Sequence, residues 1–252
     1  MDRTAGFAEV YDVIYDGPPA FIEAQVAFLT ARLGPAPAVL LDAGCGTGRH
    51  VAALGARGYT VIGVDAGPAM LAVAHGRLSE VSLPARLAAA DLRGLPFGSG
   101  EFSGAFCLES PLAYLLHGDE LASALAGFWR VLQPGGRLVV DIFDYAGTLG
   151  PDGAGPQTVC FPAAWGTVEV VEDHRCDAEA GLWRMRQAFT LYKQRGARRF
   201  TIVHIFALRT ADDYAAALEK VGFTIEDLMA QYPATPAELA GERRMIFVAT
   251  RR

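Results

Sequence analysis

The sequence predicts an α/β fold: a doubly wound, parallel seven-stranded sheet with an antiparallel β insert after its fifth strand. As far as Phe143, short apolar runs alternate with segments of helical periodicity, an order typical of parallel strands joined by crossover helices. After residue 146 the pattern changes to long β-type runs separated by polar turns. Two further β-type runs near the C-terminus complete the main sheet.

The composition is that of a globular protein with a large core. Its 252 residues, 52% hydrophobic and 20% charged, suit one decorated α/β domain or two small domains. The formal net charge of −6 argues against binding nucleic acid through the overall field of the protein. We interpret Arg195, Arg198 and Arg199 as a solvated hairpin tip rather than a basic patch.

Cysteine spacing and terminal composition bear on the compartment. The four cysteines lie far apart without C-x-x-C spacing, so we expect no metal site and no disulfide framework. A reducing cytoplasm is the natural compartment for such a chain. The first residues lack a cationic start followed by an apolar core, and no apolar run approaches the ~20 residues that span a bilayer. We therefore expect a cytoplasmic protein without membrane contact.

A glycine-rich loop follows the first strand. Val39–Leu41 is a short apolar run, and the segment after Gly48 becomes helical. Glycine adopts positive φ without penalty and lets a ligand approach the backbone closely. Gly44, Gly46 and Gly48 are spaced two apart, whereas the dinucleotide fingerprint needs its third glycine one position later. This spacing argues against NAD or FAD, and no Gly-Lys-Ser/Thr follows to form a P-loop.

An acidic residue ends the second predicted strand. Tyr59–Val64 is a run rich in β-branched residues, and Asp65 terminates it 23 residues beyond Asp42. A carboxylate at the end of a second strand can accept two hydrogen bonds from a ribose diol. We therefore predict Asp65 as the ligand of a ribose.

These residues resemble the first motifs of the class I S-adenosylmethionine (SAM) methyltransferases. In that family the glycine loop surrounds a sulfonium amino acid, and an acidic residue, here Asp42, lies where the first strand ends. The resemblance implies a Rossmann-like sheet with SAM as the cofactor. It also implies that Asp91 accepts a hydrogen bond from the adenine amino group, while the backbone N–H of Leu92 reaches a ring nitrogen.

The remaining elements follow the same alternation. Helices are expected at residues 21–33, 50–57, 68–80, 119–132 and 210–221. Main-sheet strands are expected at residues 39–41, 59–64, 85–90, 102–108, 137–143, 223–229 and 245–250, with a tight turn at 133–136. A loop at 147–158 precedes insert strands at residues 167–175, 182–192 and 199–208, which form two linked hairpins.

The N-terminal segment is predicted to be a short amphipathic helix over residues 7–15, ended by Pro18 and Pro19. The segment AEVYDVIYDG also resembles the N-terminal lid of small-molecule methyltransferases. This resemblance implies that Tyr15, and secondly Tyr11, close over cofactor and substrate. We expect residues 1–36 to form this helical lid, 37–145 and 209–252 the SAM-binding core, and 146–208 an insert that covers the substrate.

The order of segments across the chain resembles one branch of the superfamily. Residues 8–15, 40–50, 107–115 and 198–223 follow one another as in the nucleotide-linked amino-sugar N,N-dimethyltransferases of macrolide biosynthesis. One departure is Glu109-Ser110-Pro111, where that branch tends to have a bulky residue and a Ser-Ser pair. The expected cofactor contacts are Tyr11, Tyr15, Asp42, Gly44, Cys45, Gly46, Gly48, Asp65, Ala66, Met70, Ala90, Asp91, Leu92 and Leu108.

The catalytic candidates follow from the chemistry of methyl transfer. Displacement on a sulfonium carbon is promoted by positioning the nucleophile and excluding water. An amine needs little help from a base, whereas a hydroxyl usually needs one. Glu109 lies at the carboxyl end of the fourth strand, where it could act as a base or hold an ammonium group. Further candidates are His117, just past that strand, His204, which alternates with apolar residues, and Tyr15.

Not every histidine is expected in the site, and His174 is expected to be solvated. Leu108, Glu109 and Ser110 should face the transferable methyl group, because ligands bind outside the carboxyl ends of the strands in an open sheet.

We expect a small-molecule acceptor of specialised metabolism, with an amine favoured and a hydroxyl possible. One alternative is a methyltransferase for RNA or protein, which an Asn-Pro-Pro motif after the fourth strand and a basic face would favour; the sequence has neither. The other is a SAM-binding protein of the same fold that does not methylate, or that catalyses a cyclisation. The exposed face of the insert could pair two copies as a homodimer.

Overall fold

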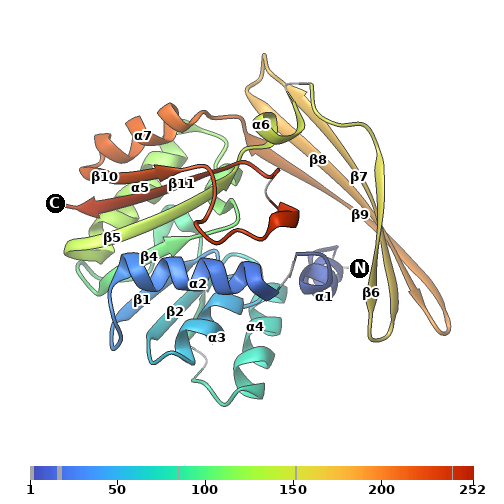
Figure 1. The fold of residues 1–252 in the computed structure, drawn as a ribbon, viewed down its shortest axis with the longest axis horizontal. Coiled ribbons are helices and arrows are strands. Elements are labelled where there is room, and N and C mark those ends of the chain that lie inside the picture. Colours follow the sequence, from blue (N-terminus) through green and yellow to red (C-terminus); the bar gives the residue numbers. More distant parts are fainter. Residues whose placement is uncertain (1–2, 16–18, 85, 151, 240) are drawn as a thin grey trace.

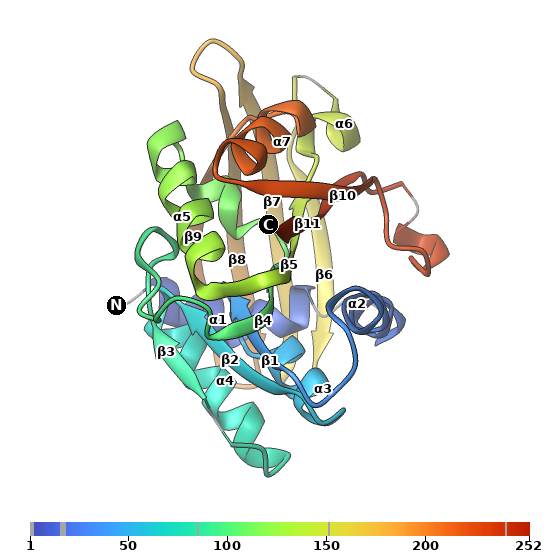
Figure 2. The same ribbon diagram turned by 90° about the vertical axis from the view of Figure 1, so that its left-hand side faces the viewer.

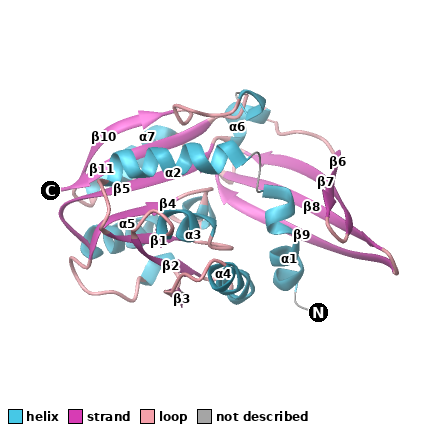
Figure 3. Cartoon of the chain, turned by 60° about the horizontal axis from the view of Figure 1, so that its bottom comes forward, coloured by secondary structure: helices cyan, strands magenta, loops and turns pink. Residues whose placement is uncertain are grey.

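The computed structural model describes residues 3–15, 19–84, 86–150, 152–239 and 241–252. Two β sheets lie side by side, and helix α1 (Arg3–Tyr15) lies between them (Figure 1). The larger sheet has seven strands in the order β10-β11-β5-β4-β1-β2-β3, and the smaller has four in the order β6-β7-β8-β9. Figure 3 shows the smaller sheet as a separate layer beyond α1.

The main sheet confirms the predicted doubly wound fold. Strands β1 to β5 are parallel, and β11 runs antiparallel to both β5 and β10. Its strands are β1 (Val39–Ala43), β2 (Thr60–Asp65), β3 (Leu87–Ala89), β4 (Phe102–Cys107), β5 (Leu132–Phe143), β10 (Phe223–Met229) and β11 (Arg244–Arg251). The other helices are α2 (Pro19–Leu33), α3 (Arg49–Gly55), α4 (Pro68–Glu80), α5 (Gly118–Val131), α6 (Tyr145–Leu149) and α7 (Ala211–Lys220), with short 3₁₀ turns η1 (Leu92–Gly94), η2 (Pro111–Tyr114) and η3 (Ala237–Leu239).

Helices cover both faces of the main sheet (Figure 2). Leu40 of β1 belongs to a core cluster shared with α2 and α3, whereas its neighbour Leu41 belongs to a cluster shared with α5 and α7. Successive strand residues point to opposite faces, so a strand that is covered on both sides must be apolar throughout. This explains the continuous apolar runs that identify the parallel strands in the sequence.

The insert contains one strand more than predicted. β6 (Gln157–Ala163) pairs with β7 (Gly166–Asp177), which is followed by β8 (Leu182–Lys193) and β9 (Gly196–Ala207), all antiparallel. The sequence predicts a loop up to residue 158, whereas β6 begins at Gln157. Pro162 lies within this strand and weakens its β-type pattern in the sequence. Because β6 is an edge strand, the missing N–H of proline is tolerated. The predicted hairpin tip is confirmed for Arg195, which lies between β8 and β9, whereas Arg198 and Arg199 lie in β9. Arg198 is not simply solvated, because its Nη1 lies 2.9 Å from Glu9 Oε2 of α1.

Several predicted boundaries shift for local reasons. β3 is confined to Leu87–Ala89, and the predicted first residue of that strand, Ala85, lies outside the described residues. Pro19 begins α2 instead of ending the preceding segment, because its fixed φ suits a first helical turn; Pro18 is not described. Residues 133–136 belong to β5, where the pairing with β4 shifts register.

Helix α1 connects the two sheets. Val10 is fully buried in a cluster with Phe189 of the insert. On the opposite side, the carboxylate of Asp12 accepts hydrogen bonds from Thr47 Oγ1 at 2.6 Å and from Arg77 Nη2 at 2.5 Å. The helix is therefore attached both to the insert and to the main-sheet domain.

Across the residues that the structure describes, no helix combines the length and the apolar character needed to cross a membrane. The same residues include no group of three or more His, Cys, Asp or Glu side chains arranged to hold a metal ion. All four cysteines are free thiols, and Cys45 and Cys107 are buried.

We expect Gly48→Ala to destabilise the fold more than Gly46→Ala. Gly48 has a φ of 75°, and a Cβ there would lie 2.9 Å from the Cβ of Ala74 on α4. Left-handed strain of ~1–2 kcal/mol and overpacking of ~1–3 kcal/mol should together lower the free energy of unfolding by ~2–5 kcal/mol. Denaturation in urea measures this loss.

Gly46→Ala is the matched control. Gly46 has a φ of 52°, and nothing lies within 4 Å of a Cβ built on it. This variant should therefore lose only the ~1–2 kcal/mol of backbone strain. Equal losses in the two variants would show that packing against α4 does not require glycine at position 48.

Candidate functional site

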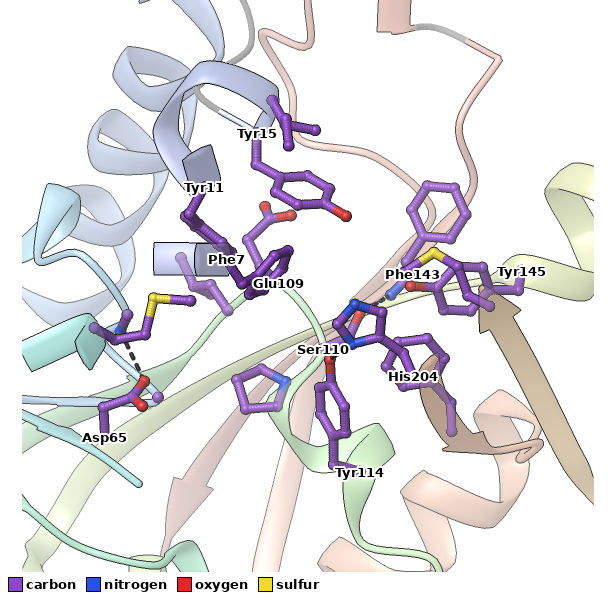
Figure 4. A pocket seen from close by; sticks show the side chains of 18 of the residues that line it. Phe7, Tyr11, Tyr15, Asp65, Glu109, Ser110, Tyr114, Phe143, Tyr145 and His204 are labelled. Carbon is purple, nitrogen blue, oxygen red and sulfur yellow. Dashed lines mark hydrogen bonds between the residues drawn. The ribbon is translucent and has the colours of Figure 1, made fainter. Parts of the chain in front are cut away.

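A cavity of about 700 Å³ lies where the carboxyl ends of the main-sheet strands meet α1 and the inner face of the insert. Ligands of open α/β sheets bind at this edge. Figure 4 shows the rings of Tyr11 and Tyr15 on α1 across the cavity from Tyr114, whereas the ring of Phe7 lies beside that of His204, with centroids 5.3 Å apart. Asp65 lies at a separate end of the same cavity (Figure 4).

The glycine loop reaches the cavity by a left-handed path. Gly44 has a φ of 83°, and its N–H donates to the carbonyl of Val64 at 2.8 Å. A Cβ on Gly44 would lie 2.5 Å from the ring of Pro111, so glycine is required here for η2 to pack against the loop. Glu109 and Ser110, which lead into η2, also have positive φ, 64° and 71°. Loop and turn thus form one continuous wall.

Two backbone amides fix the Asp65 carboxylate at the end of β2. Gly46 N donates to Oδ2 at 2.9 Å, and Gly67 N donates to Oδ1 at 2.7 Å. A carboxylate oxygen has two lone pairs, so each oxygen can accept one further hydrogen bond. Asp65 lines the cavity and therefore offers two oriented acceptors to a diol.

Most of the expected cofactor contacts line the cavity: Tyr11, Tyr15, Gly44, Gly46, Asp65, Ala66, Met70, Ala90, Asp91, Leu92 and Leu108. Asp42, Cys45 and Gly48 lie behind this surface. Asp42 is buried in β1, where burial and the neighbouring Asp65 raise its pKa well above the ordinary value. The side chain of Cys45 packs on Gly63, and Gly48 makes room for Ala74. These three residues support the loop from the core side.

Asp91 faces the cavity but already has a partner. Its Oδ2 lies 2.6 Å from Arg93 Nη2, and its Oδ1 accepts from the backbone N–H of Arg93 at 2.9 Å. Hydrogen bonds from Arg93 lower the pKa of Asp91. An adenine contact would have to share this carboxylate with Arg93.

Glu109 belongs to a buried ion network that the sequence did not reveal. Arg244 Nη1 lies 3.1 Å from Glu109 Oε1 and 2.8 Å from Asp141 Oδ2, and Gln25 Nε2 donates to Glu109 at 2.6 Å. Burial opposes the charge of Glu109, but Arg244 and then Arg49 hold its pKa below the ordinary value. Glu109 is therefore an ionised, engaged carboxylate and a poor general base.

His204 lines the cavity from β9, as its alternation with apolar residues predicts. Its Nδ1 lies 2.6 Å from Tyr114 Oη, and its Nε2 lies 3.2 Å from Gln187 Oε1. An amide oxygen only accepts, so Nε2 carries the proton and Nδ1 accepts from the tyrosine hydroxyl. Burial lowers the pKa of His204 to about 4. The ring is therefore neutral near pH 7, and its basic nitrogen is covered.

The prediction that His174 is solvated is wrong. It is buried on the inner face of β7 and lines the cavity. Trp183 Nε1 donates to its Nδ1 at 3.0 Å, and its Nε2 lies 2.6 Å from Glu172 Oε1. Because an indole N–H can only donate, Nδ1 is unprotonated, and neutral His174 donates through Nε2. The period of two from buried Val170 to His174 was the signal that could have placed it.

His117 does not lie at the site. It is exposed at the start of α5, where its backbone N–H donates to Glu120 Oε2 at 3.1 Å. His117 is not among the residues that line the cavity, so its position does not support its candidacy as a base or orienting group. Lining residues that were not predicted as site residues include Phe7, Tyr114, Phe143, Tyr145, Glu172, His174 and Arg244.

Comparisons with known proteins identify the family to which the chain belongs. Residues 40–136 match the family model described as a methyltransferase domain. A dTDP-3-amino-3,4,6-trideoxy-alpha-D-glucopyranose N,N-dimethyltransferase from Streptomyces venezuelae is 30% identical over 233 residues, covering 88% of this chain and 91% of that protein.

Solved structures give the same result over nearly the whole chain. Streptomyces venezuelae DesVI superimposes with a TM-score of 0.80 at 27% identity, covering 96% of this chain and 97% of that one. An amino pentose methyltransferase from Micromonospora echinaspora, solved with SAM bound, gives a TM-score of 0.75 at 28% identity with the same coverage. The chain therefore belongs to the class I SAM-dependent methyltransferases, in the small-molecule branch similar to the nucleotide amino-sugar N,N-dimethyltransferases.

Proposed function

We propose that this SAM-dependent small-molecule methyltransferase methylates the nitrogen of an amine of specialised metabolism. The observation that supports nitrogen over oxygen is the state of the two cavity histidines. His204 is neutral with its basic nitrogen covered by Tyr114, and His174 uses both ring nitrogens in hydrogen bonds. A hydroxyl usually needs a general base before it can attack, whereas an amine attacks with its own lone pair.

The residues of the cavity fit SAM. A Cβ built on Gly46 would meet nothing within 4 Å, so the loop presents bare backbone to a ligand, and Asp65 presents two oriented acceptors. We assign the ribose hydroxyls to Asp65, the adenine ring to Asp91 and Leu92, and the cover to Tyr11 and Tyr15. SAM supplies a methyl group activated by its sulfonium, and its displacement leaves S-adenosylhomocysteine.

The chain's own residues then act by position and charge. As the amine nitrogen forms its bond to the methyl carbon, positive charge develops on that nitrogen, which afterwards releases a proton to water. Glu109 is ionised at the end of β4, where a fixed negative charge stabilises a developing cation. The rings of Tyr11 and Tyr15 keep water from the reacting atoms, and Gln187 Nε2 donates to Tyr15 Oη at 2.6 Å.

We propose that the chain has three functional parts. Residues 1–36 form the lid, 37–145 and 209–252 the SAM-binding core, and 146–208 the substrate cover. Exposed Tyr192 and Val203 lie on the outer face of this cover and suit pairing of two copies. Light scattering on the purified protein would test a homodimer. The net charge of −6 and the free thiols support a cytoplasmic enzyme that binds neither nucleic acid nor membranes.

We expect Asp65→Ala to weaken SAM binding by ~1.5–3 kcal/mol, because hydrogen bonds to a charged group are lost. Isothermal titration calorimetry with SAM and with S-adenosylhomocysteine measures the change. Asp119→Ala, in the first turn of α5, is the control and should leave the Kd unchanged. Wild-type affinity in the Asp65 variant, with an unchanged circular dichroism spectrum, would overturn the proposed cofactor geometry.

The rate of methyl transfer should rise with pH as the bound amine loses its proton, without an inflection from His204 between pH 6 and 8. The pKa of His204 is about 4, so lowering the pH from 8 to 6 leaves this ring neutral. His204→Gln should therefore keep the shape of the profile. An inflection near pH 6.5 that disappears in this variant would instead identify His204 as a general base.

A further inference from the structure

The cavity lining carries an excess of negative charge. Its acidic side chains are Asp65, Asp91, Glu109, Glu120, Glu172 and Glu242, whereas its only arginines and lysines among the described residues are Arg93 and Arg244. Asp65, Asp91, Glu120 and Arg93 line the end that we assign to SAM, which leaves Glu109, Glu172 and Glu242 against Arg244 at the acceptor end. Burial raises the pKa of Glu242, but the excess remains even if that group is protonated. His204 does not offset it, because burial lowers the pKa of this ring to about 4, and His174 Nδ1 is occupied as an acceptor from Trp183. A cavity of this kind attracts cations and repels anions.

Both arginines are already matched by carboxylates. Arg244 lies between Glu109 and Asp141, at 3.1 and 2.8 Å. Arg93 contacts Asp91 at 2.6 Å and Glu120 at 2.5 Å. A phosphate bound here would have to compete with two carboxylates for either guanidinium. Among the described lining residues, every arginine or lysine side chain is therefore already paired with carboxylates that a phosphate would have to displace.

Glu172 has the opposite arrangement, since its partners are neutral. His174 Nε2 lies 2.6 Å from Oε1, and Gln187 Nε2 donates to Oε2 at 2.5 Å. Burial opposes the charge, but these two hydrogen bonds hold the pKa of Glu172 below its ordinary value. The side chain is 33% exposed and lines the cavity from β7. It is an oriented carboxylate without a cationic partner in the described lining.

From these charges we propose, on the premise of the function given above, that the acceptor is an amine without phosphate groups and that Glu172 binds its ammonium form as it enters. The bound ammonium then releases a proton to water, and the lone pair so freed attacks the methyl carbon. Glu172 is then a specificity-determining residue. The dTDP-linked sugar in the name of the Streptomyces venezuelae relative carries a diphosphate, which in this cavity would face carboxylates. A free amino sugar, or another small amine, matches the charge instead.

The first test compares one amine in two forms: the methyl glycoside of an amino-dideoxyhexose and its dTDP conjugate. Calorimetry measures the binding of each to the enzyme complexed with S-adenosylhomocysteine, and mass spectrometry measures their methylation. We expect the glycoside to bind at least about tenfold more tightly, with an advantage that falls as salt screens the cavity charge.

Equal or tighter binding of the dTDP conjugate would overturn the proposal, and so would failure of both compounds to bind. Loss of S-adenosylhomocysteine binding itself would instead refute the methyltransferase function, so the two failures are distinguishable.

The second test removes one charge. Glu172→Gln should raise the KM for the glycoside, or its Kd if turnover is slow, by about tenfold or more, while kcat and SAM affinity change little. Glu169→Gln is the matched control: it removes the same charge from the same strand, and residue 169 points to the opposite face. Thermal unfolding checks that both variants fold. Equal KM values for the two variants would overturn the role of Glu172.

Discussion

The carboxylate of Asp65 joins two turns on which the cofactor half of the cavity depends. It accepts hydrogen bonds from Gly46, in the loop after β1, and from Gly67, in the turn after β2. Both turns leave the same edge of the sheet, so one side chain sets the distance between them. Gly44 extends this wall by admitting the ring of Pro111, which ties the end of β4 to the loop. The remaining oxygen lone pairs of Asp65 are then oriented before any ligand arrives.

The local parts of this architecture could be predicted from the sequence, and the long-range parts could not. The glycine loop and the acid at the end of β2 can be recognised from a few neighbouring residues. The parallel strands can be recognised from their apolar runs. Arg244 lies 135 positions from Glu109, and no periodicity connects them. For His174 two sequence signals conflict: its alternation with Val170 predicts a buried side chain, whereas its polarity predicts a solvated one. The sequence could not show that His117 is not among the lining residues, because the path of η2 depends on tertiary packing rather than on local propensity.

The acceptor half of the cavity contains ionisable side chains, most of which are fixed in hydrogen bonds or ion pairs. Arg244 keeps Glu109 ionised, Trp183 and Glu172 fix the tautomer of His174, and Tyr114 covers His204. Buried polar networks of this kind hold side chains rigidly, because every broken hydrogen bond would leave a desolvated group. The acceptor half therefore contributes rigidity and charge to a displacement reaction in which the nucleophile must be oriented.

Gln187 gives helix α1 a part in acceptor recognition. Its amide nitrogen donates to Tyr15 of α1 and to Glu172 of the insert, while its amide oxygen faces His204. The acceptor wall is thus complete only while α1 is docked against the insert. Binding at that wall and docking of the helix are thermodynamically linked, so each must strengthen the other by the same free energy. Gln187, which lies between two β strands and a helix, is therefore the residue through which acceptor binding and docking of α1 stabilise each other.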